Sequence, residues 1–159
     1  MPTLVAIVSA VWWFAVRPVV SEQNWEPVRH TFALCAAPSQ SGQRAAGCVI
    51  DGDTVLLGEG QATRRIRLTG FDAPELDGAC EAERTIALTA RQRLLEWLEE
   101  GPFDWTGGAE PPRDRYGREL RALSRVDPER GRIALAEVMI SDGLASPTGW
   151  DARPTDWCG

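Results

Sequence analysis

The sequence has no lysine and no excess of positive charge. Its 17 basic residues are all arginine and stand against 23 acidic residues, so the formal net charge is −6. Affinity for nucleic-acid phosphates comes largely from cationic side chains that displace counterions. This balance argues against tight, processive or sequence-specific DNA binding, but it does not argue against a local phosphate-handling site.

The chain also lacks the length for two catalytic domains. Its 159 residues suit one domain plus a terminal extension, because single domains usually have about 100 to 200 residues. Hydrophobic residues make up 43% and charged residues 25%, which is an ordinary globular composition and argues against disorder.

Cysteine pairs at short intervals, which are typical of a zinc site, are missing as well. Cys35, Cys48, Cys80 and Cys158 are far apart in the chain, so disulfides or buried thiols are the candidates. The even number favours two disulfides and an oxidising compartment. Three pairings exist, and we prefer Cys35 with Cys48, which closes a local loop, and Cys80 with Cys158, which pins the C-terminal tail.

The one long apolar run covers residues 1–20, where no charged side chain precedes Arg17. The pair Trp12-Trp13 favours a short membrane anchor. A cleaved signal peptide fits less well, because no basic residue precedes the run, and a buried or amphipathic helix is the alternative. Arg17 and Arg29 favour a cytoplasmic orientation, whereas the cysteines favour a secreted or periplasmic domain, and we give the cysteines more weight.

The rest of the chain divides into three parts. Residues 21–45 mix Pro, Ser, Gln and Gly and are predicted to be a linker with one edge strand near 31–34. Residues 46–145 are predicted to form the folded domain, and residues 146–159 a tail tied by Cys158. We expect the protein to be a monomer.

Short β-prone runs alternate with turn residues in the predicted domain. They cover residues 48–50, 54–57, 64–71, 103–106 and 120–126. The first three predict a meander. Five short strands, with one helix after the third and another after the fifth, predict an α+β fold with a partly open barrel.

Two helices are predicted from helical spacing of apolar residues. The first has a stripe of Ala82, Ile86, Ala90, Leu94 and Leu98 and ends before Gly101. The second runs from about 133 to 141 and ends at Asp142-Gly143, where glycine can adopt the left-handed cap conformation.

Three segments contain the residues that suggest chemistry. They are Asp51-Gly52-Asp53-Thr54, the run from Arg67 to Glu75, and the run from Arg113 to Arg118. Taken singly, each has a simpler explanation: a hairpin turn, a strand-to-helix boundary and a solvated charged turn. Taken together, they suggest a shared site.

Carboxylate and carbonyl oxygens are the ligands that hard divalent cations prefer. Asp53, Asp72 and the carbonyl of Ala73 can supply them, while Glu75 can act as a base for water. Arg67 lies five residues before Asp72. Since an odd offset places two side chains on opposite faces of a strand, the sequence predicts a bend or bulge between them.

In their order and spacing, these segments resemble the staphylococcal nuclease (thermonuclease) family over about residues 48–145. The similarity includes Gly143-Leu144-Ala145 after the second helix. The resemblance implies an OB-fold barrel with flanking helices, and Ca²⁺-dependent cleavage of DNA and RNA.

The resemblance also implies a role for each matching residue. The metal site would comprise Asp51, Asp53, Asp72 and the backbone oxygen of Ala73, with Glu75 as general base. Arg67 and Arg118 would bind the reacting phosphate, and Arg115 and Tyr116 a second phosphate.

The chain departs from the family pattern in three ways. Ala73 stands where the best-known member has a hydroxyl residue. The family's third helix is missing, or is replaced by the tail. No aromatic residue clearly matches those that cover the base, although Trp150 is a candidate for stacking, or else plugs the barrel edge. His30, the single histidine, is expected to be inert.

Two alternatives to a nuclease are a catalytically inactive OB-fold module that binds nucleic acid or a protein partner, and a membrane-tethered structural protein. The first usually lacks one or more catalytic side chains. Here all five, Arg67, Glu75, Arg118, Asp53 and Asp72, are present.

Overall fold

The computed structural model describes residues 25–35, 45–58, 60–153 and 155–159. The apolar segment expected to be an anchor, residues 1–20, lies outside these ranges. Among the described residues, no helix combines the length and apolarity needed to cross a membrane.

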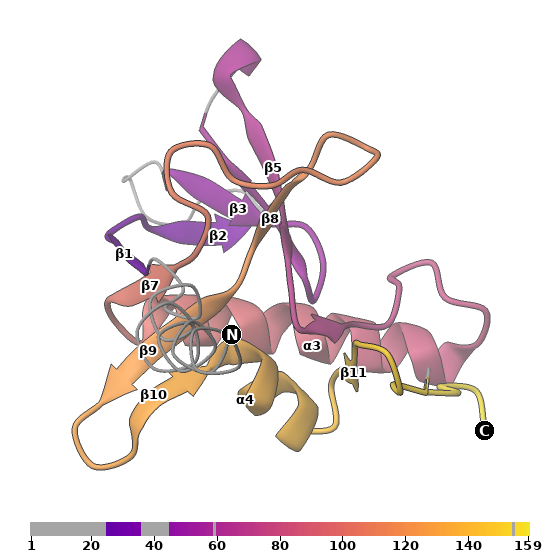
Figure 1. Ribbon diagram of the computed structural model, residues 1–159. Helices are drawn as coiled ribbons and strands as arrows, with labels where there is room; N and C mark the ends of the chain where they lie inside the picture. The colour runs from indigo at the N-terminus through magenta and orange to yellow at the C-terminus, as the bar shows by residue number, and fades with distance from the viewer. Residues whose placement is uncertain (1–24, 36–44, 59, 154) are drawn as a thin grey trace, which may run out of the picture.

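The described chain forms an α+β fold with three sheets and two α-helices (Figure 1). The largest sheet has the order β2-β3-β4-β5-β8. Its strands are β2 (Phe32–Leu34), β3 (Gly47–Val49), β4 (Thr54–Leu57), β5 (Arg64–Leu68) and β8 (Glu119–Arg121). The meander β3-β4-β5 is antiparallel, as predicted, while β2 and β8 add in parallel at its two edges. A short 3-10 helix, η2 (Gly60–Ala62), precedes β5.

The second sheet has the order β1-β7-β9-β10, with every pair antiparallel. Its strands are β1 (Glu26–Val28), β7 (Phe103–Trp105), β9 (Leu123–Asp127) and β10 (Gly131–Ala134). A third, two-stranded sheet pairs β6 (Phe71–Asp72) with β11 (Ser146–Pro147).

Three predictions about these strands are wrong. The described part of the expected linker, residues 21–45, contains the edge strand expected near 31–34, which is β2, where Phe32 is buried with its ring centre 6.3 Å from that of Phe103, but it also contains a strand that was not predicted, β1. The strand expected at 120–126 is two strands, and β10 occupies the predicted start of the second helix. The described residues therefore form more than the five strands expected.

The helices are α3 (Glu81–Glu99) and α4 (Leu135–Ser141). The predicted stripe on α3 holds from Ala90 onward, but Ala82 is exposed. The buried residues are instead Ala87, Ala90, Leu94, Leu95, Trp97 and Leu98. The N-terminal end of the helix extends towards the C-terminal tail (Figure 1). Helix α4 ends as predicted, with Gly143 at φ 70°.

Both preferred disulfides are present, Cys35–Cys48 and Cys80–Cys158. The tail begins with β11 beside β6 and has no third helix among its described residues. The core lies between the largest sheet and the helices and includes Val49, Ile66 and Leu68. Because Ile66 and Leu68 point into this core, the alternating residue Arg67 faces outward.

Candidate active site

The two segments of the site meet at a bend between β5 and β6. Strand β5 ends at Leu68, and Gly70 has φ 97°, a conformation that suits glycine. The chain then turns into β6, and a guanidinium nitrogen of Arg67 contacts a carboxylate oxygen of Asp72. The bend that the odd spacing predicted is therefore present.

Asp53 joins this pair from the start of β4. This residue is only 2% exposed. Oδ1 accepts hydrogen bonds from Arg67 Nη1 at 2.6 Å and Thr54 Oγ1 at 3.0 Å, and Oδ2 accepts one from the Ala73 backbone at 3.0 Å. Asp51 Oδ1 accepts the backbone N–H of Asp53 at 3.1 Å, so it shapes the same turn.

Glycine at position 52 allows this turn to pack closely. A Cβ atom there would lie 2.6 Å from Cβ of Ala73 and 2.9 Å from Cβ of Ala90. Real Cβ atoms do not approach that closely, so a side chain would push the turn away from β6 and α3. Gly52 thus fixes the position of the two aspartates on either side of it.

Carboxylates outnumber positive charges at this site. Burial raises the pKa of Asp53 to about 7, and nearby Asp51 adds to this, although Arg67 opposes it. The pKa of Glu75 is raised by partial burial and then by Asp51, while Arg67 again opposes the shift. Glu75 therefore belongs to the same electrostatic cluster, although its side chain is exposed.

The oxygen ligands at this site suit a hard divalent cation. The guanidinium of Arg67 joins the buried carboxylate of Asp53 to the exposed carboxylate of Asp72, and Asp51 lies in the same turn as Asp53. This contact shows that the position favours positive charge. Among the described residues, the sole cluster of three metal-ligand side chains within 4.8 Å is Cys80, Glu83 and Cys158, whose sulfurs are bonded to each other.

Among the described residues, Arg118 makes no hydrogen bond to the clustered aspartates. It ends the turn 113–118, where its Nε donates to Asp114 Oδ2 at 2.6 Å. Asp114 Oδ1 also accepts the backbone N–H groups of Tyr116 and Arg118. The turn is therefore held in one shape, with β8 following directly and pairing beside β5.

The same turn exposes Arg115 and Tyr116. The Arg115 guanidinium lies 4.7 Å from the Tyr116 ring centre and donates to its hydroxyl at 2.6 Å. Tyr116 is 68% exposed, so its ring is available to a ligand. Trp150 is 97% exposed, which rules out its alternative role of plugging the barrel edge.

Two residues with clear structural roles at the site were not predicted. Thr54 directs its hydroxyl to Asp53, and Asp114 holds Arg118. Aspartate often accepts hydrogen bonds from backbone N–H groups a few residues further along a turn. The role of Asp114 could therefore have been found from the sequence. His30, expected to be inert, lies 6.3 Å from the Trp105 ring and away from the site.

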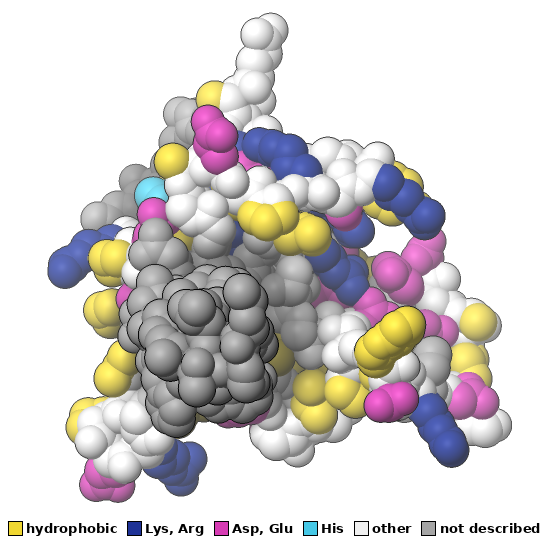
Figure 2. Space-filling view, viewed as in Figure 1, with side chains coloured by type: hydrophobic (Ala, Val, Ile, Leu, Met, Phe, Trp, Pro, Cys, Tyr) yellow, Lys and Arg dark blue, Asp and Glu magenta, His cyan; other side chains and the backbone are white. Residues whose placement is uncertain are grey.

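Charged side chains of both signs are interleaved on the face that carries β5 and the tail (Figure 2). Two surface pockets, of about 470 and 450 Å³, lie elsewhere: one beside β2 and the end of α3, the other around Trp105. Neither contains the clustered aspartates.

No model of a known protein family matches the chain. A curated relative from Shigella flexneri, described as a micrococcal nuclease, is 30% identical over 112 residues, which make up 68% of this chain and 59% of the relative. The chain thus spans about three fifths of the length of the relative that it matches. Together with the order of the three motifs, this similarity places the chain in a staphylococcal nuclease-like family.

Proposed function

We propose that this protein is a Ca²⁺-dependent nuclease that hydrolyses phosphodiester bonds in DNA and RNA. The observation that supports this most directly is the convergence of Asp53, Arg67 and Asp72 at the β5–β6 bend. Glu75 lies in the same electrostatic cluster. The printed description of the curated relative as a micrococcal nuclease supports the same class of reaction.

The proposal includes an OB-type, partly open barrel built from the five-stranded sheet. The parallel addition of β2 and β8 at opposite edges of an antiparallel meander supports this arrangement. Strand β5 then runs beside β8, so the turn containing Arg118 and the strand containing Arg67 are neighbours in the sheet.

Asp51, Asp53, Asp72 and the carbonyl of Ala73 would hold the cation. When bound, Ca²⁺ supplies positive charge that stabilises the negative charge developing on the phosphate oxygens. It would also favour the ionised form of Asp53, whose raised pKa reflects uncompensated burial.

Glu75 is the proposed general base. Its pKa is raised by partial burial and by neighbouring carboxylates, which brings its basicity closer to that needed for proton abstraction near neutral pH. The Glu75 carboxylate would take a proton from the water that attacks phosphorus. Its exposure leaves room for that water beside the substrate.

Arg67 and Arg118 are the proposed phosphate-binding residues. Arg67 uses one donor on Asp53 and one on Asp72, and a guanidinium has five donors, so others remain for a phosphate oxygen. Arg118 uses Nε on Asp114, and neither of its terminal nitrogens donates to another described residue. Because aspartates already hold both guanidinium groups in position, these donors can stabilise the negative charge that develops on the phosphate without first having to reorient.

Arg115 and Tyr116 would contact a neighbouring phosphate, and Trp150 would stack on a base. Their exposure on short turns supports contact with a flexible single strand. The acidic net charge predicts weaker, less selective binding than a basic nuclease would have.

We also propose that the domain acts as a monomer in the periplasm or outside the cell, either membrane-anchored or secreted. The two disulfides support an oxidising compartment.

The test uses the full chain with single-stranded DNA and RNA, in the presence of Ca²⁺ or of a chelator. We expect cleavage that depends on Ca²⁺, and a loss of about 100-fold or more in Glu75→Gln. Glu110→Gln, which removes an exposed carboxylate outside the cluster, is the matched control and should cleave like wild type. Intact substrate with folded wild-type protein and Ca²⁺ would refute the proposal.

A second candidate is a non-catalytic module that binds nucleic acid or a protein partner. One observation favours it: both candidate phosphate-binding arginines, Arg67 and Arg118, are already paired with carboxylates. Saturable binding of an oligonucleotide that is unaffected by Ca²⁺, without cleavage, would support this candidate instead.

A further inference from the structure

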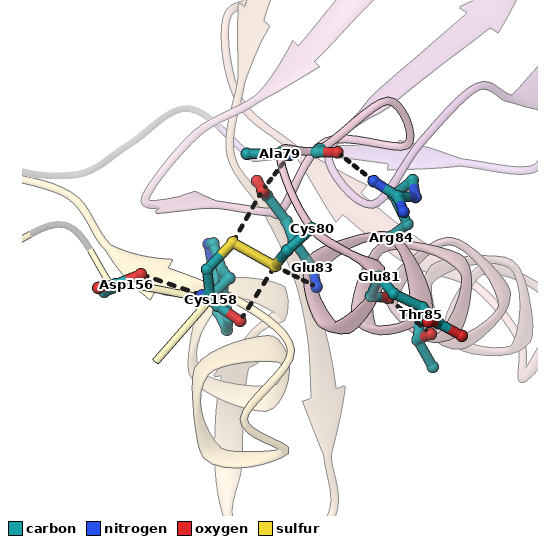
Figure 3. Close-up of a disulfide and its surroundings, with 10 residues drawn as sticks. Ala79, Cys80, Glu81, Glu83, Arg84, Thr85, Asp156 and Cys158 are labelled. Atoms are coloured by element: carbon teal, nitrogen blue, oxygen red, sulfur yellow. Dashed lines mark hydrogen bonds between the residues drawn. A yellow bond between two sulfur atoms is a disulfide. The ribbon is translucent and has the colours of Figure 1, made fainter.

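The tail, residues 146–159, is attached to the rest of the molecule at two places. Strand β11 pairs with β6, and this register sets Ser146 opposite Asp72. Cys158 is bonded to Cys80, directly before α3 (Figure 3). The tail is therefore joined at one end to the strand that carries a candidate metal ligand, and at the other end to a disulfide.

Few non-covalent contacts hold the tail beyond β11. Thr155 exchanges hydrogen bonds with the side chain of Ser146 through its backbone N–H at 3.1 Å and its hydroxyl. Most of the described residues after Gly149 are exposed. A segment with so little burial opens easily, so the order of the tail depends on the disulfide, which closes a separation of 78 residues.

The two sulfurs differ in a way that suits reduction. Cys158 is exposed, so a thiolate reagent can reach it. Cys80 is the N-cap of the 19-residue helix α3, and its Sγ accepts the backbone N–H of Glu83 at 3.4 Å. The positive end of the helix stabilises negative charge on that sulfur. The helix N-terminus thus favours Cys80 as the leaving sulfur when Cys158 is attacked, while the Glu83 carboxylate, within 4.8 Å of both sulfurs, opposes negative charge there.

The other disulfide is placed differently. Cys48 lies within β3, and Cys35 follows β2 and donates its N–H to Val49 at 3.0 Å. Arg91 also donates to the carbonyls of Cys35 and Val49. Several hydrogen bonds therefore hold both ends of this bridge in place whether or not the sulfurs are bonded.

We propose that Cys80–Cys158 is a redox-controlled tether whose reduction frees the tail from β6 and weakens substrate binding at the neighbouring site. A dithiol reductant in the same compartment as the domain would supply the two electrons and two protons: the S–S bond breaks, both cysteines become thiols, and the dithiol closes to its own disulfide. This inference rests on the proposed nuclease function.

Release of the tail affects the site through two structural changes. The backbone of Asp72 loses its β-partner Ser146. Trp150, in the turn after β11, no longer follows a strand that is paired with β6. Both changes reduce substrate affinity while leaving Glu75 in place, so they should raise KM more than they lower kcat.

The experiment compares the oxidised full chain with the same chain after treatment with dithiothreitol. KM and kcat are measured on single-stranded DNA with Ca²⁺, and amide hydrogen exchange is followed in peptides covering residues 71–72 and 146–158. We expect KM to rise about tenfold, the scale of losing one stacking contact. Exchange should become faster in both peptides but not in α3 beyond its first turn.

Two paired variants control for the reagent and for the other disulfide. Cys80→Ser with Cys158→Ser should behave like the reduced protein, and dithiothreitol should not change it further. Cys35→Ser with Cys48→Ser should still respond to dithiothreitol. If that second pair does not fold, peptide-level exchange in wild type still separates the two regions.

Unchanged KM and unchanged exchange at residues 71–72 after full reduction, verified by thiol counting, would overturn the tether. A fall in kcat alone would also overturn it. If the oxidised protein cleaves nothing, the nuclease proposal fails instead. The exchange rates and the dissociation constant for an oligonucleotide then decide the tether separately.

Discussion

Two clusters of arginine and carboxylate lie on strand β5, and they differ in which charge is in excess. At the start of the strand, Arg64 donates two 2.7 Å hydrogen bonds to Glu119, which also accepts from Arg121 at 3.1 Å. Near its end, Arg67 alone pairs with two aspartates, Asp53 and Asp72. One cluster thus has surplus arginine and the other surplus carboxylate.

The pKa values follow the imbalance. Hydrogen bonds from Arg64, and then from Arg121, lower the pKa of Glu119 to about 2, although burial opposes this. Burial raises the pKa of Asp53 to about 7 despite Arg67. The first cluster satisfies its own charge and is structural. The second favours additional positive charge, which is what a cation-dependent phosphate site requires.

Exchanging each arginine for lysine gives the largest expected contrast. In Arg67→Lys, a single ammonium cannot bridge two carboxylates and also contact a phosphate. We expect the cleavage rate to fall about 100- to 1,000-fold. Arg64→Lys should cleave at the wild-type rate but lose about 1 to 2 kcal/mol of unfolding free energy, since it loses a paired hydrogen bond. Steady-state kinetics and urea denaturation measure the two effects. A wild-type rate in Arg67→Lys would remove the distinction between the clusters.

Removing the charge of Glu119 tests the structural cluster. Its side chain is 2% exposed, and so is that of Arg121. Glu119→Gln leaves this buried guanidinium without its counter-charge, and we expect a loss of about 3 kcal/mol in unfolding free energy, measured in urea at pH 7. Glu110→Gln, at an exposed position, should change it by less than about 0.5 kcal/mol.

The pH dependence of the unfolding free energy shows whether Glu119 stabilises the fold through its charge. Because the folded pKa of Glu119 is lowered from 4.5 to about 2, its contribution to stability is fully present above pH 4.5 and is lost as the pH falls towards 2. The difference in unfolding free energy between wild type and Glu119→Gln should therefore narrow by about 3 kcal/mol across that range. A constant difference would mean that Glu119 contributes by packing rather than by charge.

Local patterns were sufficient to predict part of the candidate site. The odd spacing of Arg67 and Asp72 required a bend, and Gly70 supplies it with a positive φ. The helix-ending glycine at position 143 was equally predictable. These features depend on the backbone preferences of a few neighbouring residues, which can be inferred from the residue types alone.

Non-local pairing explains what the sequence did not predict. Strand β1 contains Pro27 and has only three residues, so it carries little period-two signal. It forms because β7 offers a partner across about 75 residues of chain. The ion pair between Arg118 and Asp114, on the same turn, was not predicted either. Which carboxylate an arginine takes depends on three-dimensional distances that spacing does not give.

Calcium should stabilise the protein through the second cluster only. A ligand at 100 times its dissociation constant raises the unfolding free energy by about 2.7 kcal/mol. We expect a shift of this order at pH 8 in wild type and Glu119→Gln, and none in Asp72→Asn, when thermal unfolding is followed with and without Ca²⁺. At pH 5.5 the shift should shrink, because the raised pKa of Asp53 keeps its carboxyl protonated there. An equal shift in Asp72→Asn would locate the cation elsewhere.

The smallest expected effect tests the bend that creates the acidic cluster. Gly70 has φ 97°, and a Cβ there would lie 3.1 Å from Cβ of Ala136. Gly70→Ala should lose about 1 kcal/mol in unfolding free energy, and its cleavage rate should also fall as Asp72 shifts away from Arg67. Gly131→Ala is the matched control, since Gly131, the first residue of β10, has φ 79° with open space around it. If both variants lose the same stability but only Gly70→Ala cleaves more slowly, the contact between Arg67 and Asp72 depends on the bend. Equal rates would mean that the site forms without it.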